Sequence, residues 1–445
     1  MSNARAQRLL DAPILPTIAR LAAPGALLAL FQTAVSIADT HYVGRLGTEA
    51  LAGLALVFPL VMLLQMTSAG AMGGGVSSAL ARALGAGQDA AARRLVTHAL
   101  AIALGAGLAF TVLLLALGEV LYALLGGKGE ALAQALAYSH VLFAGAVFVW
   151  LANTLASILR GSGNTLTPAI ALAAAATVQI PLSGALTLGW AGFPRLGIAG
   201  AALAYVAAFL VASVIMGAVL WRGALRPHRA DWEFEARHFR EILRVGAVSS
   251  IGALQTVLTA VVLTGFVGSF GTAALAGYGV GVRLELLQVP LVFAIGQALV
   301  VLVGTSIGAG RAARAKRIAW TGTAIAAALS LAIGVFVAVY PAAWIHLFSD
   351  DPAGLETGAL YLRIVAPFYA MFGAGMALYF SSQGAGRMLL PVLAGTVRLV
   401  LVAAGGAAVV ALAGPLAAVF AVVAGGMVLF GTLIATAVYR GAWGS

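Results

Sequence analysis

Apolar blocks of about twenty residues or more recur along this chain, and its charged residues fall in short clusters between them. A block of that length is what a helix needs to cross the hydrocarbon core of a bilayer. Only 9% of the 445 residues are charged, against roughly a quarter in a soluble chain. The blocks are continuous, whereas the strands of an outer-membrane barrel alternate apolar and polar side chains. The pattern therefore predicts an all-α polytopic membrane protein.

The hydropathy predicts twelve transmembrane helices, at residues 14–38, 50–76, 93–117, 131–158, 165–188, 197–221, 243–268, 273–304, 317–347, 356–380, 389–411 and 415–439. With both termini in the cytoplasm, most basic residues lie on that side, and Arg45, Lys128 and Arg195 lie outside. The net charge of +11 thus follows the positive-inside rule and is not a sign of nucleic-acid binding. We expect a multi-pass protein of the bacterial cytoplasmic (inner) membrane, surrounded by lipid and with no nucleic-acid partner.

The second half of the chain repeats motifs of the first. "VGRLGTEALAG" at 43–53 returns as "VGSFGTAALAG" at 267–277, and "GSGNTLTP" at 161–168 returns as "GAGRMLLP" at 384–391. "LGAG" at 84–87 returns as "IGAG" at 307–310. The common offset, 223 or 224 residues, covers six predicted helices, an even number, so both halves have the same orientation in the membrane. We predict two pseudo-symmetric six-helix bundles, at 1–221 and 243–445.

The linker between the halves, residues 222–242, belongs to the longest polar stretch of the chain. Trp232, Phe239 and Ile242 fall near one face of a helical projection, which predicts an amphipathic helix on the cytoplasmic membrane surface. There is no cysteine, so disulfides and cysteine-based metal sites are excluded. No phosphate-binding loop, HExxH sequence or nucleophile constellation is found, so we expect neither an enzyme nor a bound cofactor or metal.

Four segments give the chain a resemblance to the MATE family of multidrug and toxic compound extrusion transporters. They are "ADTHYVGRLGTEALAG", "ILRGSGNTLTP", "GFPRLGIAGAALA" and "VGTSIGAG", in family order over nearly the whole chain. The resemblance implies two six-helix lobes and export of cationic or amphipathic compounds, driven by protons or sodium ions. The segment 282–310 looks closest to the DinF-like branch, which is regarded as proton-coupled. We expect the protein to act as a monomer.

Asp39 is the acid that an otherwise apolar first span carries. A charged side chain at the bilayer centre costs on the order of 2.5–3.5 kcal/mol on insertion scales, so it is rarely kept without a use. Gln32, Ser36 and Asp39 share one helical face, which we expect to point into the lobe. The alternative is that Asp39 reaches the membrane interface or caps a helix. The family resemblance implies that an acid at this position is the principal ion-coupling residue.

On the fifth predicted helix, the positions where the family usually carries Asn and then Asp or Asn hold Gln179 and Ser183. A second acid in the first lobe is therefore missing. Asn153 and Gln179 are candidates to bind Asp39 or the substrate, or else are polar side chains satisfied between helices. Tyr138 is a further cavity candidate, although tyrosines are also common at membrane interfaces.

In the second half, the position that repeats Asp39 is apolar, at Val262 or Leu263. Gln255 stands near the position where some sodium-coupled relatives carry an acid, which weakens a sodium site in this lobe. Arg283 and Glu285 form a possible second charged site: either a self-neutralised pair or a gating and protonation site. Arg363 and Arg398 also lie within predicted spans and are expected to snorkel or to line the cavity.

We therefore predict a secondary antiporter that exports amphipathic small-molecule cations in exchange for protons by alternating access. Within the same superfamily, a sodium-coupled drug antiporter and a lipid-linked precursor flippase are the alternatives. A membrane-embedded enzyme or a channel is the alternative from another class. The lack of enzyme motifs argues against the former, and a two-lobed repeat with a buried acid argues against a simple pore.

Overall fold

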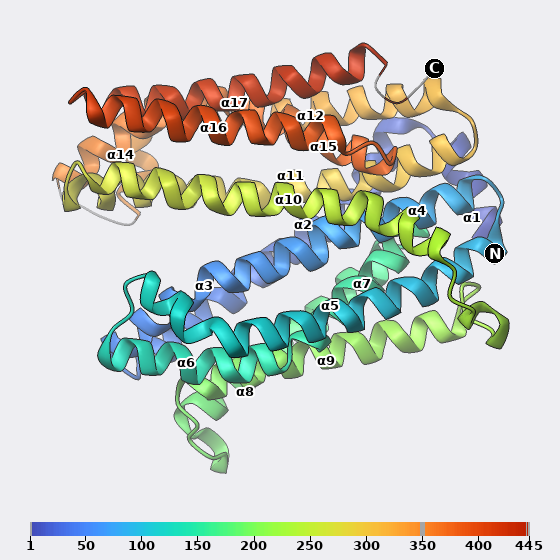
Figure 1. Cartoon of the computed structure of the whole chain (residues 1–445), viewed down its shortest axis with the longest axis horizontal. Helices are drawn as coiled ribbons and strands as arrows, with labels where there is room; N and C mark the ends of the chain where they lie inside the picture. The colour runs from blue at the N-terminus through green and yellow to red at the C-terminus, as the bar shows by residue number, and fades with distance from the viewer. Residues whose placement is uncertain (1, 348–351, 442, 444–445) are drawn as a thin grey trace. The chain divides into compact units, whose positions relative to one another are not determined.

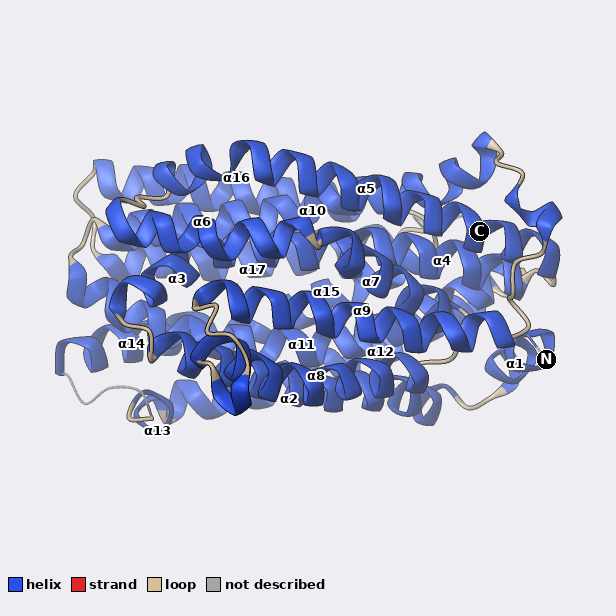
Figure 2. Cartoon of the chain, turned by 90° about the horizontal axis from the view of Figure 1, so that it is seen from below, coloured by secondary structure: helices blue, strands red, loops and turns tan. Residues whose placement is uncertain are grey.

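The computed structural model describes residues 2–347, 352–441 and 443, and within that part every regular element is a helix (Figure 2). The helices are, in chain order, α1 (Ser2–Asp11), α2 (Ile14–Gly44), α3 (Thr48–Gln65), η1 (Met66–Met72), α4 (Gly73–Gly85), α5 (Asp89–Leu124), α6 (Gly129–Ala144), α7 (Ala146–Gly161), α8 (Leu166–Leu188), η2 (Trp190–Gly192), α9 (Ile198–Arg222), η3 (Arg229–Trp232), α10 (Ala236–Gly268), α11 (Thr272–Gly308), α12 (Ala312–Val339), α13 (Pro341–Ile345), α14 (Pro352–Val365), η4 (Ala366–Phe368), α15 (Tyr369–Gly384), α16 (Leu389–Ala411) and α17 (Leu416–Tyr439). The all-α fold class predicted from the sequence is confirmed.

The number of membrane spans also agrees with the prediction. In the described part, 11 helices are long and apolar enough to cross a bilayer, and α6 with α7 form a twelfth if the bent pair counts as one span. The bend between α6 and α7 is 51° and falls at Gly145. Helices are the form that a single segment can take in lipid, because they satisfy all of their backbone hydrogen bonds internally.

Three loops of each half have closely similar backbone angles in both copies of the repeat. Equivalent glycines adopt closely similar positive φ angles: 120° and 110° at Gly47 and Gly271, 73° and 72° at Gly87 and Gly310, and 79° and 75° at Gly163 and Gly386. A positive φ in this range strains any residue with a Cβ atom, so glycine is the natural residue there. The repeated motifs therefore encode the same turns at the same places.

The chain divides into two compact units. Unit 1 holds residues up to Asp11 and Ala23–Ala247, and unit 2 holds Ala12–Ala22 and Val248–Ser445. The division between the halves lies close to the predicted boundary at residue 243. The sequence did not indicate that the first turns of α2 are grouped with the second half, nor that the first turns of α10 are grouped with the first.

In unit 1, α8 and α9 pack closely side by side, and α7 packs against α4, α5 and α9 (Figure 1). Gly200 makes the closest part of the α8–α9 contact possible, because a Cβ atom there would lie 2.8 Å from the backbone nitrogen of Thr187. Small residues that let two backbones approach are the usual device of helix packing in membranes. The helix that carries Gln179 and Ser183 is thereby fixed against its neighbour.

In unit 2, α11 packs against α12, α14 and α15, and α17 packs against α14, α15 and α16. The core of this unit is rich in aromatic side chains, among them Tyr278, Tyr361, Tyr369 and Phe420, all buried. A buried tyrosine hydroxyl usually has a hydrogen-bond partner. We therefore expect polar side chains of unit 2 next to these rings.

The linker differs from the predicted amphipathic helix. Residues 223–235 form an irregular segment with one short 3-10 turn, η3, and α10 begins only at Ala236. Pro227, which has no backbone N–H to donate, falls within this segment. Trp232 is 45% exposed while Ile242 is fully buried, so the residues expected on one apolar face have different surroundings.

Candidate functional site

Asp39 lies near the end of α2 and faces α8. Its Oδ2 accepts a hydrogen bond of 2.9 Å from Nε2 of Gln179. Its Oδ1 is buried and has no hydrogen-bond partner among the residues that the structure describes. One of the two carboxylate oxygens is thus held by a donor, and the other is not.

Ser183 stands one turn beyond Gln179 on the same helix and is fully buried. It is close enough to interact with Asp39, yet its Oγ makes no hydrogen bond within the described part of the chain. An unpaired buried polar atom costs roughly 1–3 kcal/mol, so it is normally satisfied. Oδ1 of Asp39 and Oγ of Ser183 are two such atoms. Gain or loss of a proton at Asp39 would change the hydrogen bonds that they can make.

The polar face predicted for the first span is not continuous in the structure. Asp39 is half-buried against α8, whereas Gln32 and Ser36 are exposed and do not bond to it. The neighbouring Leu30 and Ile37 are 62% and 66% exposed. Of the predicted face, the structure thus pairs Asp39 with α8, and the direction in which Gln32 and Ser36 point stays a prediction.

Asn153 of α7 belongs to a different network. Its Nδ2 donates to Oε1 of Gln65 at 3.0 Å and to Oγ of Ser68 at 2.8 Å. Nε2 of Gln65 in turn donates to the hydroxyl of Tyr205 on α9. This is the arrangement of a polar side chain satisfied between helices, one of the two alternatives considered for Asn153.

The Gln65 network sits where α3 gives way to the π-helix η1. Wider helical turns of this kind are rare and are often found at functional sites. Ser68 is part of the turn and Gln65 immediately precedes it. The sequence reading missed Gln65, Ser68 and Tyr205 because a π-helix has no clear sequence signal.

Two tyrosines of unit 1 lie within electrostatic reach of Asp39. Tyr138 of α6 is 6% exposed, and Tyr205 of α9 is the partner of Gln65. Both interact with the Asp39 charge. The surroundings of Asp39 thus comprise Gln179, Ser183 and these two phenol rings.

Gln255 of α10 belongs to unit 2 and is buried. Its Nε2 donates to Oγ1 of Thr396 on α16 at 2.7 Å, and its Oε1 has no partner among the described residues. A Cβ atom at Gly395 would meet the same Oε1, so the amide is tightly enclosed.

Glu285 of α11 is held inside unit 2 by groups other than its neighbour in sequence. The hydroxyl of Tyr361 donates to its carboxylate, and the charge of Arg398 on α16 acts on it. Arg398 lies over the ring of Phe372, 5.1 Å from the ring centroid, and 5.8 Å from the centroid of Phe430. Arg283, the other half of the predicted charged site, is exposed.

Both lobes place a tyrosine beside their buried acid at the same position of the repeat. Tyr138 and Tyr361 differ by 223 in number, as do the buried or half-buried glutamines Gln65 and Gln288. Gln288 donates to Oγ of Ser330 at 2.6 Å. The offset of the loop motifs, applied to the spans, is the signal that would have found Tyr361 and Gln65.

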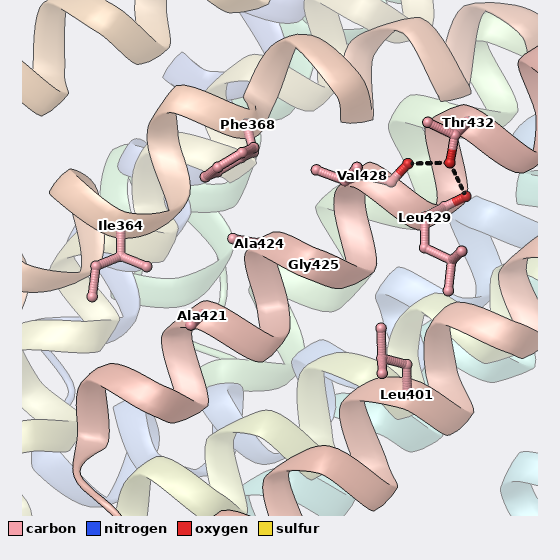
Figure 3. A pocket seen from close by; sticks show the side chains of 9 residues that line it. All are labelled: Ile364, Phe368, Leu401, Ala421, Ala424, Gly425, Val428, Leu429 and Thr432. Atoms are coloured by element: carbon pink, nitrogen blue, oxygen red, sulfur yellow. Dashed lines mark hydrogen bonds between the residues drawn. The ribbon is translucent and has the colours of Figure 1, made fainter.

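The clearest groove in unit 2 is apolar. It has a volume of about 590 Å³ and is bounded by η4, α14, α16 and α17 (Figure 3). Thr432 is the hydroxyl residue of its lining, and its Oγ1 already donates to the carbonyls of Val428 and Leu429. The groove contains none of the predicted site residues. In the part of the chain that the structure describes, no three His, Cys, Asp or Glu side chains gather as ligands for a metal ion.

Comparison with known proteins places these features in a family. A family profile described as MatE matches residues 24–184 and again 249–409, one match in each half. The chain is 27% identical over 367 residues to a protein of Shewanella oneidensis named FAD transporter, covering 82% of this chain and 81% of that protein. It is 26% identical over 379 residues to a probable multidrug resistance protein NorM of Thermotoga maritima, covering 84% and 81%.

Solved structures agree over the whole length. A transporter of the MOP superfamily from Pyrococcus furiosus superimposes with a TM-score of 0.89 at 25% identity, covering 97% of both chains. The outward-facing structure of a multidrug resistance MATE family transporter superimposes with a TM-score of 0.86 at 25% identity, covering 98% of this chain and 96% of that one.

Proposed function

Because this chain belongs to the MatE family, we propose that it is a secondary transporter that exports amphipathic cations in exchange for protons, with Asp39 as the proton-coupling carboxylate. The names of two relatives, a probable multidrug resistance protein and an FAD transporter, support export of small organic molecules. No enzymatic activity is proposed.

The observation that carries the proposal is the half-satisfied carboxylate of Asp39 within a candidate membrane span. A carboxylate that loses its hydration becomes easier to protonate. The free Oδ1 gives the proton a place to bind without breaking the Gln179 hydrogen bond to Oδ2. Protonation removes the charge that attracts a cation, so substrate and proton compete for the same residue, as an antiporter requires.

The groups around Asp39 support a proton rather than a sodium ion. Hard metal cations need several oxygen ligands. Gln179 presents its amide N–H to Asp39, and the amide N–H groups of Asn153 are turned to Gln65 and Ser68. The acid that many relatives carry on the fifth span is Ser183 here. A sodium ion would find one carboxylate and few free oxygens.

Glu285 is assigned a structural role. A buried charge is expensive unless an opposite charge compensates it. Arg398 and the Tyr361 hydroxyl provide that compensation within unit 2, whereas no basic side chain acts on Asp39 among the residues that the structure describes. We therefore propose the coupling for the lobe whose acid has no such partner.

Export of an anionic flavin nucleotide is the second candidate, favoured by the likeness to the FAD transporter of Shewanella oneidensis. Arg283 and Arg363, two exposed basic residues within spans of the second half, provide charges of the sign that a pyrophosphate needs. A panel that includes FAD beside cationic dyes separates the two substrate classes.

The test uses everted membrane vesicles with ethidium as the transported cation. A proton gradient imposed without sodium is expected to drive uptake by the wild-type protein, and a sodium gradient alone is not. Asp39→Asn is expected to abolish uptake and the matching dissipation of the proton gradient. Glu119→Gln, which removes an exposed carboxylate on α5, is the matched control and is expected to transport normally. Full proton-driven uptake by Asp39→Asn at wild-type expression would refute the assignment.

A further inference from the structure

The segment that joins α9 to α10 is fastened to the first turns of α5 by side chains that the transport site does not use. Oγ1 of Thr97 donates to the backbone carbonyl of Asp231 at 2.7 Å. Nε of Arg93 lies 3.3 Å from Oδ2 of Asp231, and Arg94 forms an ion pair with Glu235. All of these residues belong to unit 1. The segment is thus attached at both Asp231 and Glu235.

His98 lies between these two attachments and is fully buried. Its Nδ1 is 2.6 Å from the backbone carbonyl of Arg94, and its Nε2 is 2.9 Å from the backbone nitrogen of Glu235. A carbonyl oxygen only accepts a hydrogen bond, and a backbone N–H only donates one. The hydrogen of the neutral ring must therefore sit on Nδ1, and Nε2 must offer its lone pair to Glu235. One neutral tautomer satisfies both contacts.

Aromatic rings close the site from the side of the linker and α10. The ring centroid of His98 lies 5.2 Å from that of Phe234, 4.6 Å from that of Phe239 and 5.0 Å from that of His238. His238 is 2% exposed, and its Nδ1 has no partner among the described residues. His98 is therefore enclosed by three rings, one of which is a second buried imidazole.

The charged groups around His98 balance, with three arginines against three carboxylates. On α5 they are Arg93 and Arg94, and on the linker and α10 they are Asp231, Glu235, Arg237, His238 and Glu241. Arg93 is paired with Asp231, and Glu235 is shared by Arg94 and Arg237. Desolvation raises the pKa of Glu235, but the hydrogen bond and charge of Arg237, with the charges of Arg94 and His238, outweigh it and keep that pKa below its ordinary value. Glu235 therefore stays ionised through the range where histidines titrate.

We propose that these contacts form an acid-sensitive latch, the His98 latch, made of His98, Arg94 and the backbone N–H of Glu235. A proton on Nε2 turns the acceptor into a donor, breaks the hydrogen bond from Glu235 and adds a positive charge to an enclosed site. The latch holds while the ring is neutral and releases when the ring takes up a proton. In a transporter that brings protons into the cell, it would report acidification on the cytoplasmic side, whichever residue carries the coupled proton.

Hydrogen exchange of the full-length protein in detergent tests the latch. Exchange of amides 228–238 is measured at pH 7.5 and 5.5 and corrected for the intrinsic pH dependence of exchange. For a latch opened by one proton, protection is expected to fall by up to about tenfold for each unit by which the pH is lowered. His98→Gln places an amide oxygen where Nε2 was, which accepts from Glu235 but takes no proton, so its protection is expected to be the same at both pH values.

Two matched variants locate the response. His238→Gln and His140→Gln, the latter an exposed histidine on α6, are expected to keep the wild-type pH dependence. Wild-type protection that does not change with pH, or a pH response that survives in His98→Gln or disappears in His238→Gln, overturns the proposal. If His98→Gln does not fold, nitrogen NMR of histidine-labelled wild-type protein decides. The latch requires the Nδ1–H tautomer at pH 7.5 and protonation in step with the loss of protection, and an Nε2–H tautomer refutes it.

Discussion

The hydrogen bond from Gln179 to Asp39 makes the sharpest prediction. It is 2.9 Å long, Gln179 is 5% exposed, and no other side chain donates a hydrogen bond to the carboxylate in the part of the chain that the structure describes. A hydrogen bond to a charged group contributes about 1.5–3 kcal/mol. Gln179→Leu keeps the approximate volume but removes the donor. The variant therefore destabilises the charged form of Asp39 more than the protonated form, because the carboxylate is the stronger acceptor of the Gln179 hydrogen bond.

One pH unit corresponds to 1.36 kcal/mol between two protonation states. The loss therefore shifts the pH midpoint of proton release by about 1–2 units, and the sign is upward, because the variant holds its proton more tightly. The assay is ethidium-dependent proton release from purified protein in liposomes, recorded from pH 5.5 to 9. Maximal release below the midpoint is expected to be retained.

Gln32→Leu is the matched control, because it removes an exposed glutamine from α2, the helix of Asp39. Its midpoint is expected to remain within a few tenths of a pH unit of wild type. A Gln179→Leu profile that coincides with wild type, in protein that binds ethidium normally, would show that the hydrogen bond does not control proton binding at Asp39. A downward shift would contradict the sign of the argument.

Three further predictions follow from the packing. Asn153→Leu leaves Oε1 of Gln65 and Oγ of Ser68 without their donor, and is expected to cost about 1–3 kcal/mol of stability; unchanged thermal unfolding in detergent would contradict this. Gly200→Val forces a branched side chain against the α8 backbone and is expected to cost about 1–3 kcal/mol and to lower transport, whereas Gly217→Val, at a glycine with open space around it, is expected to do neither. Arg398→Met is expected to destabilise the protein less when combined with Glu285→Gln, with a coupling of about 0.5–3 kcal/mol; strict additivity in the double-mutant cycle would remove the compensation assigned to the pair.

The features that the sequence predicted well depend on local patterns. Span positions follow from continuous apolar length, because the bilayer sets the length of a crossing helix. The repeated turns follow from glycines at a constant offset, and Gly47 and Gly271 show that a shared motif means a shared backbone angle. The location of an acid in the first span is likewise a property of one segment.

The contacts within the site depend on packing between helices that are far apart in the sequence. Local sequence patterns do not determine that packing. Helical spacing grouped Gln32 with Asp39, yet Gln32 is exposed whereas Asp39 is hydrogen-bonded to α8. Sequence proximity grouped Arg283 with Glu285, yet the contacts of Glu285 come from α14 and α16, more than seventy residues away. Irregular elements were also not predicted from the sequence pattern. The π-helix beside Gln65 and the segment before Ala236 each stand where a regular helix was expected.

The two lobes share a backbone plan and differ in how each acid is compensated. Tyr138 and Tyr361 occupy equivalent positions beside the acids, but Asp39 and Glu285 are not equivalent, since they come from the first and second spans of their halves. Glu285 accepts a hydrogen bond from a tyrosine hydroxyl and lies in the field of an arginine, so groups that compensate its charge are built into its own lobe. Asp39 has one amide donor and a free oxygen, so its neutralisation depends on what binds. A duplicated fold can therefore compensate the acid of one lobe from within and leave the acid of the other lobe to a proton or a cation. On this argument, giving Asp39 a permanent counter-ion, as in Ser183→Lys, should abolish exchange while the fold is retained.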